Sequence, residues 1–275
     1  MTSQDTTIPG GHRLALAVEY DGSAFNGWQR QQSPDIPTVQ AVLESALSQV
    51  ANEPVKTVCA GRTDSGVHAT CQVIHFEAEI DRGEKAWTRG VNSLLPGSVR
   101  VIWARGVPED FHARFSATGR RYVYLMHQTR TASALHAGKL TPVFHALDVE
   151  AMNQGASCLL GEQDFSSFRA AGCQSRSPNR EVFSAEIKTR GELCYLDIHA
   201  NAFLQHMVRN IMGALLEVGR GDKPPRWIAE LLAAKDRTQA GIAAAPDGLY
   251  LMQVDYPQEF ALPETSRLPL ILGPQ

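Results

Sequence analysis

The stretch AGRTDSGVHA, residues 60–69, brings together side chains that could carry chemistry. A single carboxylate, Asp64, stands between two glycines, with Arg62 two residues before it and His68 four residues after it. A neighbouring cation keeps a carboxylate ionised even where water is excluded, which a nucleophile or a base requires. The glycines allow another backbone or a substrate to approach closely. Asp64 is therefore a candidate catalytic residue, with Arg62 as its neighbouring charge.

The same tripeptide D-S-G also suits an ordinary turn, in which the Asp64 side chain bonds to its own backbone and closes a hairpin. Such a turn needs no arginine two residues upstream. Arg62 is the residue that favours the catalytic interpretation over the structural one.

Paired aromatic side chains occur in the segment FSATGRRYVYL, residues 115–125. On a strand, Tyr122 and Tyr124 point to one face, with Arg121 on the other. Paired aromatics of this kind usually belong to the core. Beside Arg120 and Arg121, one of them could instead stack on a nucleobase, which stabilises binding by about 1–3 kcal/mol per base.

A third candidate is Arg209, the only formal charge between residues 198 and 216. The surrounding segment is apolar on most faces of a helix and is therefore expected to be buried on most faces. A buried charge needs a partner. A structural salt bridge with a distant acid and a phosphate or carboxylate ligand are both open.

Strand and helix patterns alternate twice in the same order, which predicts an α+β protein. Two split βαβ units indicate two related ferredoxin-like halves with antiparallel sheets facing a central cleft, residues 1–110 with the catalytic aspartate and residues 111–275 completing the RNA-binding cleft. The turn at Asp64 then lies between two strands, where a side chain is held rigidly. The predicted strands are 13–20, 55–60, 69–78, 99–107, 120–128, 182–190, 193–200 and 249–256, and the predicted helices are 38–51, 84–95, 149–161, 202–219 and 227–234.

The composition is that of an ordinary globular protein, with 275 residues, 43% apolar and 20% charged. The N-terminal residues lack the pattern of a signal peptide, and no apolar run approaches the roughly 20 residues that span a bilayer. Five cysteines without C-x-x-C spacing predict reduced thiols, a cytoplasmic location and no metal site.

The distribution of charge is more informative than the net charge of −3. Residues 111–147 and 165–180 contain no Asp or Glu but several arginines, and the chain uses Arg far more than Lys. Arg binds phosphate through a planar fork and stacks on bases, so this pattern suits nucleic acid. An ordinary solvated pair of strands remains the alternative.

At this point the motifs match a known family. GRTDSGVHA resembles the catalytic motif of the tRNA pseudouridine synthase A family, including its nucleophilic aspartate. The resemblance covers nearly the whole chain and includes YDGSAFNGWQRQ, PTVQ at 37–40, FHARFSATGRRYVY, DFSSFRA, HMVRNIMG and DGLYL.

The resemblance implies isomerisation of uridine to pseudouridine at tRNA positions 38, 39 and 40, in the anticodon stem-loop. It also implies a homodimer that uses no cofactor and no metal. By position, Asp64 matches the nucleophile, Tyr122 the tyrosine that stacks on the target uracil, Arg62 and Arg209 the basic residues around the aspartate, and Leu249 an apolar residue of the pocket. The expected tRNA contacts are Phe111, His112, Arg114, Arg120 and Arg169.

Two other functions fit parts of the pattern. A non-catalytic RNA-binding protein would keep the basic segments and the aromatics but would not need Asp64 with Arg62. A retaining glycosidase-like hydrolase would need a second carboxylate about 5–5.5 Å from the first, and the acid-free segments supply no obvious one.

Overall fold

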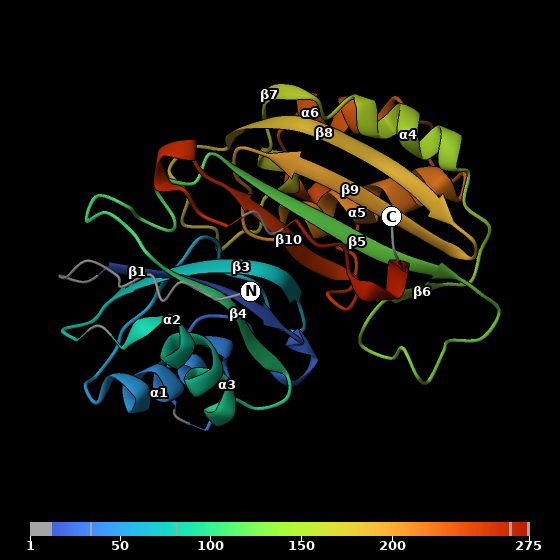
Figure 1. Cartoon of the computed structure of the whole chain (residues 1–275). Helices are drawn as coiled ribbons and strands as arrows, with labels where there is room; N and C mark the ends of the chain where they lie inside the picture. The colour runs from blue at the N-terminus through green and yellow to red at the C-terminus, as the bar shows by residue number, and fades with distance from the viewer. Residues whose placement is uncertain (1–12, 34, 81, 264–265, 274–275) are drawn as a thin grey trace. The chain divides into compact units, whose positions relative to one another are not determined.

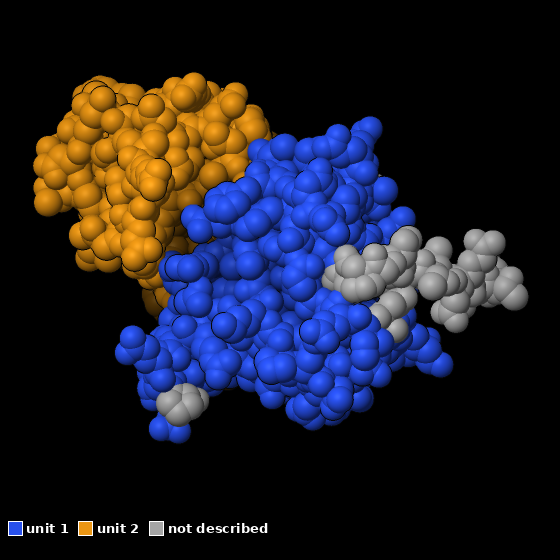
Figure 2. Space-filling model, turned by 90° about the vertical axis from the view of Figure 1, so that its left-hand side faces the viewer, with its two compact units in different colours: residues 1–118, 251–267 blue, residues 119–250, 268–275 orange. Residues whose placement is uncertain are grey.

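The computed structural model describes residues 13–33, 35–80, 82–263 and 266–273. The N-terminal stretch that bears on a signal peptide lies outside these ranges. The chain forms two compact units, residues 1–118 with 251–267 (unit 1) and residues 119–250 with 268–275 (unit 2), shown in two colours in Figure 2. The division thus falls after residue 118, where the sequence predicts one after 110, and a C-terminal segment belongs to unit 1. Within the described ranges, no helix is both long and apolar enough to cross a membrane.

Unit 1 is built on antiparallel strands that are buried on both faces. The order is β4-β1-β3-β2, because β1 pairs with β4 and β3, and β2 pairs with β3. The register places Leu16 of β1 opposite Ile74 of β3 and Ala104 of β4. The strands are β1 (Arg13–Tyr20), β2 (Val58–Cys59), β3 (His68–Glu77) and β4 (Val99–Gly106).

One face of these strands is covered by helices, visible beside them in Figure 1. Helix α1 (Val39–Ala51) begins after Thr38, whose side chain accepts a hydrogen bond from the backbone of Ala41, and ends at Asn52 in the left-handed conformation (φ 59°). The predicted helix 84–95 consists of α2 (Gly83–Lys85), a π-helical turn (Ala86–Gly90) and α3 (Val91–Leu94). The opposite face carries an apolar cluster that includes Trp103, Phe111 and Phe260.

Unit 2 has a mostly antiparallel set of strands in the order β5-β9-β8-β7, with the short β6 parallel to β5. Strands β8 and β9 form the predicted hairpin, with Gly191 at φ 59° in its turn. The strands are β5 (Gly119–Gln128), β6 (Thr141–Val143), β7 (Gly161–Asp164), β8 (Asn179–Arg190) and β9 (Leu193–Ala200). The last strand, β10 (Leu249–Asp255), is divided: Leu249 and Tyr250 belong to unit 2 and its other residues to unit 1.

The helices of unit 2 are α4 (Val149–Ser157), α5 (Met207–Gly219) and α6 (Trp227–Ala234). The predicted helix 202–219 is wrong at its start, because His206 at φ 61° is in a left-handed conformation that a helix cannot continue through. Nearly all of α5 is buried, as its apolar faces predict. Single 3₁₀ turns occupy Gly22–Ala24, Ser166–Phe168, Arg237–Gln239, Gln258–Phe260 and Leu270–Leu272.

The predicted α+β class is confirmed. Helices and mostly antiparallel strands are both present, and the β-hairpins and helix connections follow the predicted order of elements.

Candidate active site

Asp64 lies in the turn that connects β2 to β3 in unit 1. The backbone N–H of Val67 donates to the Asp64 carbonyl at 3.2 Å, and Gly66 at φ 80° takes the left-handed conformation that closes the turn. Asp64 is half-buried, whereas Arg62 is exposed and Thr63 between them is buried. The turn therefore carries a half-buried carboxylate and an exposed arginine on a backbone that is anchored through Thr63.

Two hydrogen bonds provide that anchor. The Tyr20 hydroxyl lies 2.8 Å from Thr63 Oγ1, and the Trp28 backbone N–H donates to the Thr63 carbonyl at 3.0 Å. Tyr20 and Trp28 are themselves buried, and their ring centroids are 5.8 Å apart. The side chain and the backbone of the residue before Asp64 are thus both fixed from within unit 1.

The segment 22–28 packs directly against the turn, and two glycines make this possible. A Cβ at Gly22 would lie 2.0 Å from the Val67 carbonyl oxygen, and one at Gly27 (φ 88°) would lie 2.9 Å from that of Thr63. The Phe25 carbonyl accepts from the Gly66 N–H at 3.3 Å. The motif YDGSAFNGW therefore forms the support of the Asp64 turn, which the sequence alone did not reveal.

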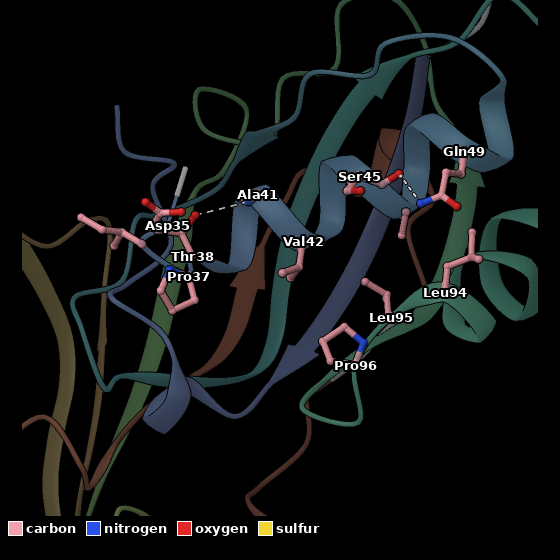
Figure 3. A pocket seen from close by; sticks show the side chains of 12 residues that line it. Asp35, Pro37, Thr38, Ala41, Val42, Ser45, Gln49, Leu94, Leu95 and Pro96 are labelled. Atoms are coloured by element: carbon pink, nitrogen blue, oxygen red, sulfur yellow. Dashed lines mark hydrogen bonds between the residues drawn. The ribbon is translucent and has the colours of Figure 1, made fainter. Parts of the chain in front are cut away.

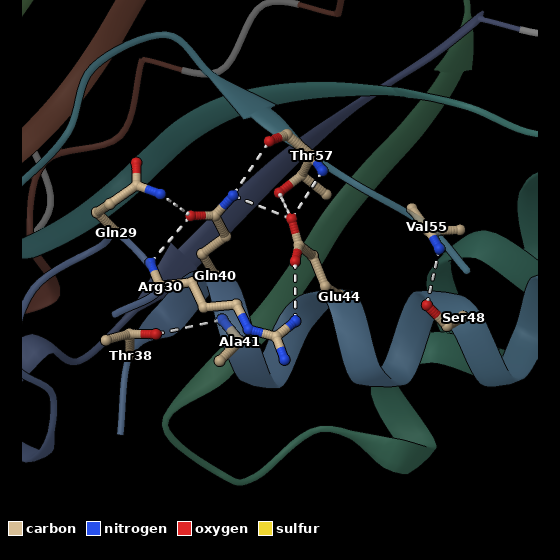
Figure 4. A network of polar contacts seen from close by, with 9 residues as sticks. All are labelled: Gln29, Arg30, Thr38, Gln40, Ala41, Glu44, Ser48, Val55 and Thr57. Atoms are coloured by element: carbon tan, nitrogen blue, oxygen red, sulfur yellow. Dashed lines mark hydrogen bonds and ion pairs between the residues drawn. The ribbon is translucent and has the colours of Figure 1, made fainter. Parts of the chain in front are cut away.

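A buried carboxylate of α1, Glu44, links the helix to Arg30 and to Thr57 (Figure 4). It accepts from the backbone N–H of Thr57 at 2.8 Å and from Gln40 Nε2 at 3.0 Å, and it lies 3.6 Å from an Arg30 nitrogen. Gln40 Oε1 in turn accepts from the Arg30 backbone and from Gln29. Gln40 thus connects the PTVQ motif to the WQRQ motif, and Gln40 is itself held by the hydrogen-bonded Glu44 carboxylate.

Two arginines that are far apart in sequence act on one buried thiol. Burial raises the pKa of the Cys59 thiol to about 12, although the nearby Arg62 and Arg114 guanidiniums pull it down. Cys59 therefore stays protonated and is no nucleophile at neutral pH. Its environment also shows that Arg62, beside Asp64, and Arg114, an expected tRNA contact, share one electropositive region of unit 1.

The tyrosines of β5, in unit 2, have different surroundings. Tyr122 is 8% exposed, and its ring meets Phe203 edge-on with the centroids 5.1 Å apart. Tyr124 is fully buried, and its hydroxyl bonds to Thr141 and to the Ala245 carbonyl. Burial raises the pKa of Tyr124 to about 12. Tyr124 is thus a structural residue, and Phe203 is a neighbour of Tyr122 that the sequence interpretation missed.

Arg209 lies in the first turn of α5 and is half-buried. Its Nε donates to the Ala244 carbonyl at 2.8 Å, while the Ala244 N–H donates to the Arg209 carbonyl at 2.9 Å. This pair fixes the segment that leads into β10, where Leu249 is 5% exposed. A Cβ at Gly248 would meet the Leu125 carbonyl oxygen at 2.3 Å, which explains the glycine of DGLYL.

The expected tRNA contacts divide into exposed and buried side chains. Arg114 is exposed and His112 half-buried, whereas Phe111 is fully buried in the apolar cluster of unit 1. In unit 2, Arg120 is 8% exposed and donates to the Asn201 carbonyl at 2.9 Å. Arg169 donates to the Cys173 and Ser175 carbonyls, so its guanidinium shapes the loop that follows it.

A pocket of about 680 Å³ opens on the outer side of α1 (Figure 3). Thr38, Val42 and Ser45 of the α1 region line one wall, and Leu95 and Pro96 line the other. None of its lining residues is one of the candidate catalytic or tRNA-binding side chains. The candidate site is therefore defined by the Asp64 turn and not by this pocket.

A family model described as tRNA pseudouridine synthase matches residues 16–116 and 156–257 of the chain. The chain belongs to this family. It is accordingly an enzyme, an isomerase that acts on uridine. The matched residues include the Asp64 turn and the segment 20–28 that packs against it. They also include Phe203, Arg209 and Leu249.

The chain is similar over nearly its whole length to proteins named tRNA pseudouridine synthase A. It is 54% identical to tRNA pseudouridine synthase A of Pectobacterium atrosepticum over 261 residues, which cover 95% of this chain and 92% of that protein. It is 53% identical to the protein of the same name from Escherichia fergusonii over 269 residues, 98% of this chain and 99% of that one. A crystal structure of a Cbf5-Nop10-Gar1 complex aligns at 15% identity with a TM-score of 0.31, over 74% of this chain and 45% of that one.

Proposed function

We propose that the protein isomerises uridine to pseudouridine at positions 38, 39 and 40 in the anticodon stem-loop of tRNAs, with Asp64 as the nucleophile. The observation that carries this proposal is the Asp64 turn, a half-buried carboxylate on a backbone anchored at Thr63 and backed by segment 22–28. Membership of the family and the names of its relatives support tRNA as the substrate.

A target uridine in or beside a helical stem must leave the stack before it can react, which costs a few kcal/mol. Arg62, Tyr122, Arg209 and Leu249 are proposed to bind the target nucleotide, with Tyr122 stacking on the uracil. Contacts to tRNA phosphates dominate affinity, and Arg114 is the most exposed of the proposed arginine contacts. Phe111, being buried, is proposed to act by positioning His112 and Arg114.

The reaction breaks the bond between N1 and C1′, rotates the base and joins C5 to C1′. Asp64 acts either at C1′, by attack or by removing the C2′ proton to give a glycal, or by addition at C6. Loss of the C5 proton completes the reaction, and the N1 freed from C1′ takes up a proton, so no atom is gained or lost overall. Tyr122 is the proposed base for this last proton transfer.

We also propose that both units follow one ferredoxin-like plan. The order β4-β1-β3-β2 in unit 1 supports it, since this is the 4-1-3-2 order of a split βαβ unit, and the order β5-β9-β8 in unit 2 matches the 1-3-2 part of the same order. A homodimer in the cytoplasm belongs to the same proposal. A monomer mass in sedimentation at micromolar concentration would reject the dimer.

The test is tritium release from tRNA that carries 5-³H-uridine, with wild type and Asp64→Asn compared and the modified position mapped. Wild type should release tritium from the anticodon stem-loop, and Asp64→Asn should release none while it still binds tRNA, because phosphate contacts dominate affinity. Near-wild-type turnover by Asp64→Asn would remove Asp64 from the mechanism. Tight binding by wild type without release from any tRNA would leave an RNA-binding protein without this activity.

A further inference from the structure

Phe115 is 77% exposed, an unusual environment for a large aromatic side chain. It follows Arg114 in the loop between β4 and β5, at the start of the acid-free segment 111–147. A single exposed apolar side chain is common on protein surfaces, so the significance of Phe115 depends on what surrounds it. The surroundings of Phe115 show that it is held in place.

The Phe115 ring stacks on the imidazole of His112, with centroids 4.3 Å apart and an interplanar angle of 29°. The backbone N–H groups of Arg114 and Phe115 both donate to His112 Nδ1 at 3.1 Å. His112 in turn contacts the ring of His75, with centroids 4.7 Å apart. The three rings form a column that extends from the buried His75 to the exposed Phe115.

The loop that carries this column is pinned at Ala113, which is fully buried. Its N–H donates to His75 Nδ1 at 3.1 Å, and its carbonyl accepts from the Tyr256 hydroxyl at 2.6 Å. Backbone fixed on both sides of one residue leaves little freedom to the next two. Phe115 is therefore presented in a preorganised position, which lowers the entropic cost of binding.

Two arginines lie near the column, Arg114 and Arg13, of which Arg13 is paired with Glu77. The Arg114 guanidinium carbon lies 5.6 Å from the centre of the Phe115 ring, near the outer limit of a cation–π contact. Burial lowers the pKa of His112, and the nearby Arg13 and Arg114 lower it further, so the ring under Phe115 is neutral at pH 7. With 77% of Phe115 still exposed, there is room for a planar ligand on the ring with a cation beside it.

We propose that Phe115 is a stacking platform for an unpaired base of the tRNA substrate, with Arg114 binding the adjacent phosphate. The proposal rests on the proposed function for the identity of the RNA. Every nucleobase offers a π-face, so the platform needs no particular sequence. The acid-free segment and the flanking arginine favour an anionic occupant over a neutral one, and the exposed Phe115 ring, on which a base can stack, favours RNA over an acidic peptide.

Equilibrium tRNA binding at several salt concentrations separates stacking from phosphate contact. Phe115→Ala should weaken binding by about 5- to 150-fold with an unchanged slope of log Kd against log salt. Phe115→Leu should be as weak as Phe115→Ala, whereas Phe115→Trp should retain affinity. Arg114→Ala should instead make the slope shallower by about 0.7–0.9. Phe183→Ala, at a 45% exposed phenylalanine of β8 that lies outside both acid-free segments, is the matched control and should bind as wild type does.

A second RNA tests whether the base must be unpaired. For a blunt-ended, fully paired RNA duplex, Phe115→Ala and wild type should bind equally. Three results would each overturn the proposal: an equal loss of affinity for both RNAs in Phe115→Ala, full affinity of Phe115→Leu for tRNA, or unchanged tRNA binding by Phe115→Ala. A lower sedimentation mass of Phe115→Ala without RNA would assign the residue to a protein interface instead.

Wild-type tritium release distinguishes the two proposals. Release by wild type with unchanged binding by Phe115→Ala would reject the platform alone, whereas absence of release by wild type would reject the proposed function and leave the binding comparison valid. Thermal melts of the Phe115 variants should match wild type, because the side chain is mostly exposed.

Discussion

The Tyr20 hydroxyl lies 2.8 Å from Oγ1 of Thr63, the residue immediately before Asp64. Tyr20 is the last residue of β1, so this hydrogen bond joins the end of a central strand to the turn that carries the candidate nucleophile. Both side chains are buried, at 3% and 7% exposure. The bond is therefore protected from water and can hold the turn in one position.

Removing this hydrogen bond should impair turnover more than stability. Thr63→Val keeps the shape of the side chain but leaves the Tyr20 hydroxyl without this partner, and Thr63→Ser retains the bond. We expect kcat of Thr63→Val to fall about tenfold or more with KM little changed, because small displacements of a reacting group cost much in rate. Single-turnover kinetics on tRNA would measure it. Equal rates for Thr63→Val and Thr63→Ser would show that the bond does not position Asp64.

The contact of segment 22–28 with the turn depends on Gly22. In Gly22→Ala the new Cβ would lie 2.0 Å from the Val67 carbonyl oxygen, so the two backbone segments must separate. Overpacking of this kind costs about 1–3 kcal/mol. Gly97→Ala is the control, since no atom lies within 4 Å of a Cβ there, and it should leave the free energy of unfolding nearly unchanged. Urea denaturation of both variants tests this, and equal stability would show that the backbone yields without cost.

Glu44 accepts three hydrogen bonds in a buried position, two from Thr57 and one from Gln40. Glu44→Gln introduces an NH₂ group at a position where the neighbouring groups are hydrogen-bond donors, and it removes the negative charge near Arg30. We expect unfolding to become easier by about 1–3 kcal/mol, the cost of leaving buried polar groups unpaired. Glu84→Gln, at an exposed glutamate, should change stability by less than about 0.5 kcal/mol. Equal unfolding midpoints for the two variants would contradict the network's role.

Acid should destabilise unit 1 through His75. The pKa of His75 is lowered from 6.5 to about 4, mainly by burial and to a smaller extent by the nearby His112 and Arg13. Because the folded pKa lies below the unfolded one, this contribution is complete above pH 6.5 and is lost as the pH falls toward 4. Between pH 7 and pH 5 it amounts to about 2 kcal/mol.

His75→Asn keeps an acceptor for the Ala113 N–H but does not titrate in this range. We expect its free energy of unfolding to vary less between pH 7 and pH 5 than that of wild type, in urea titrations at each pH. The lowered pKa of His112 acts in the same direction and should remain in the variant. An identical pH dependence of the two proteins would exclude His75 as the source.

The regular elements followed from the sequence because their apolar periods are local. Strand β1 and helix α6 have the predicted bounds, and Gly191 marks the turn of the predicted hairpin. The short strands β6 and β7 were not predicted, since three or four residues cannot show a period. The early start predicted for α5 failed because the left-handed His206 leaves no mark in an apolar pattern.

The sequence by itself determined that Asp64 stands on a glycine-hinged turn between two strands and that an acid-free, arginine-rich stretch follows residue 110. Only the tertiary structure decided which side chains of FHARF face solvent: Phe111 is buried and Phe115 exposed. A loop has no period that could assign its faces. Two hydrogen bonds of Ala113 fix this arrangement: its N–H donates to His75 Nδ1, and its carbonyl accepts from the Tyr256 hydroxyl. Both partners are distant in the chain, so these contacts depend on the packing of the whole unit.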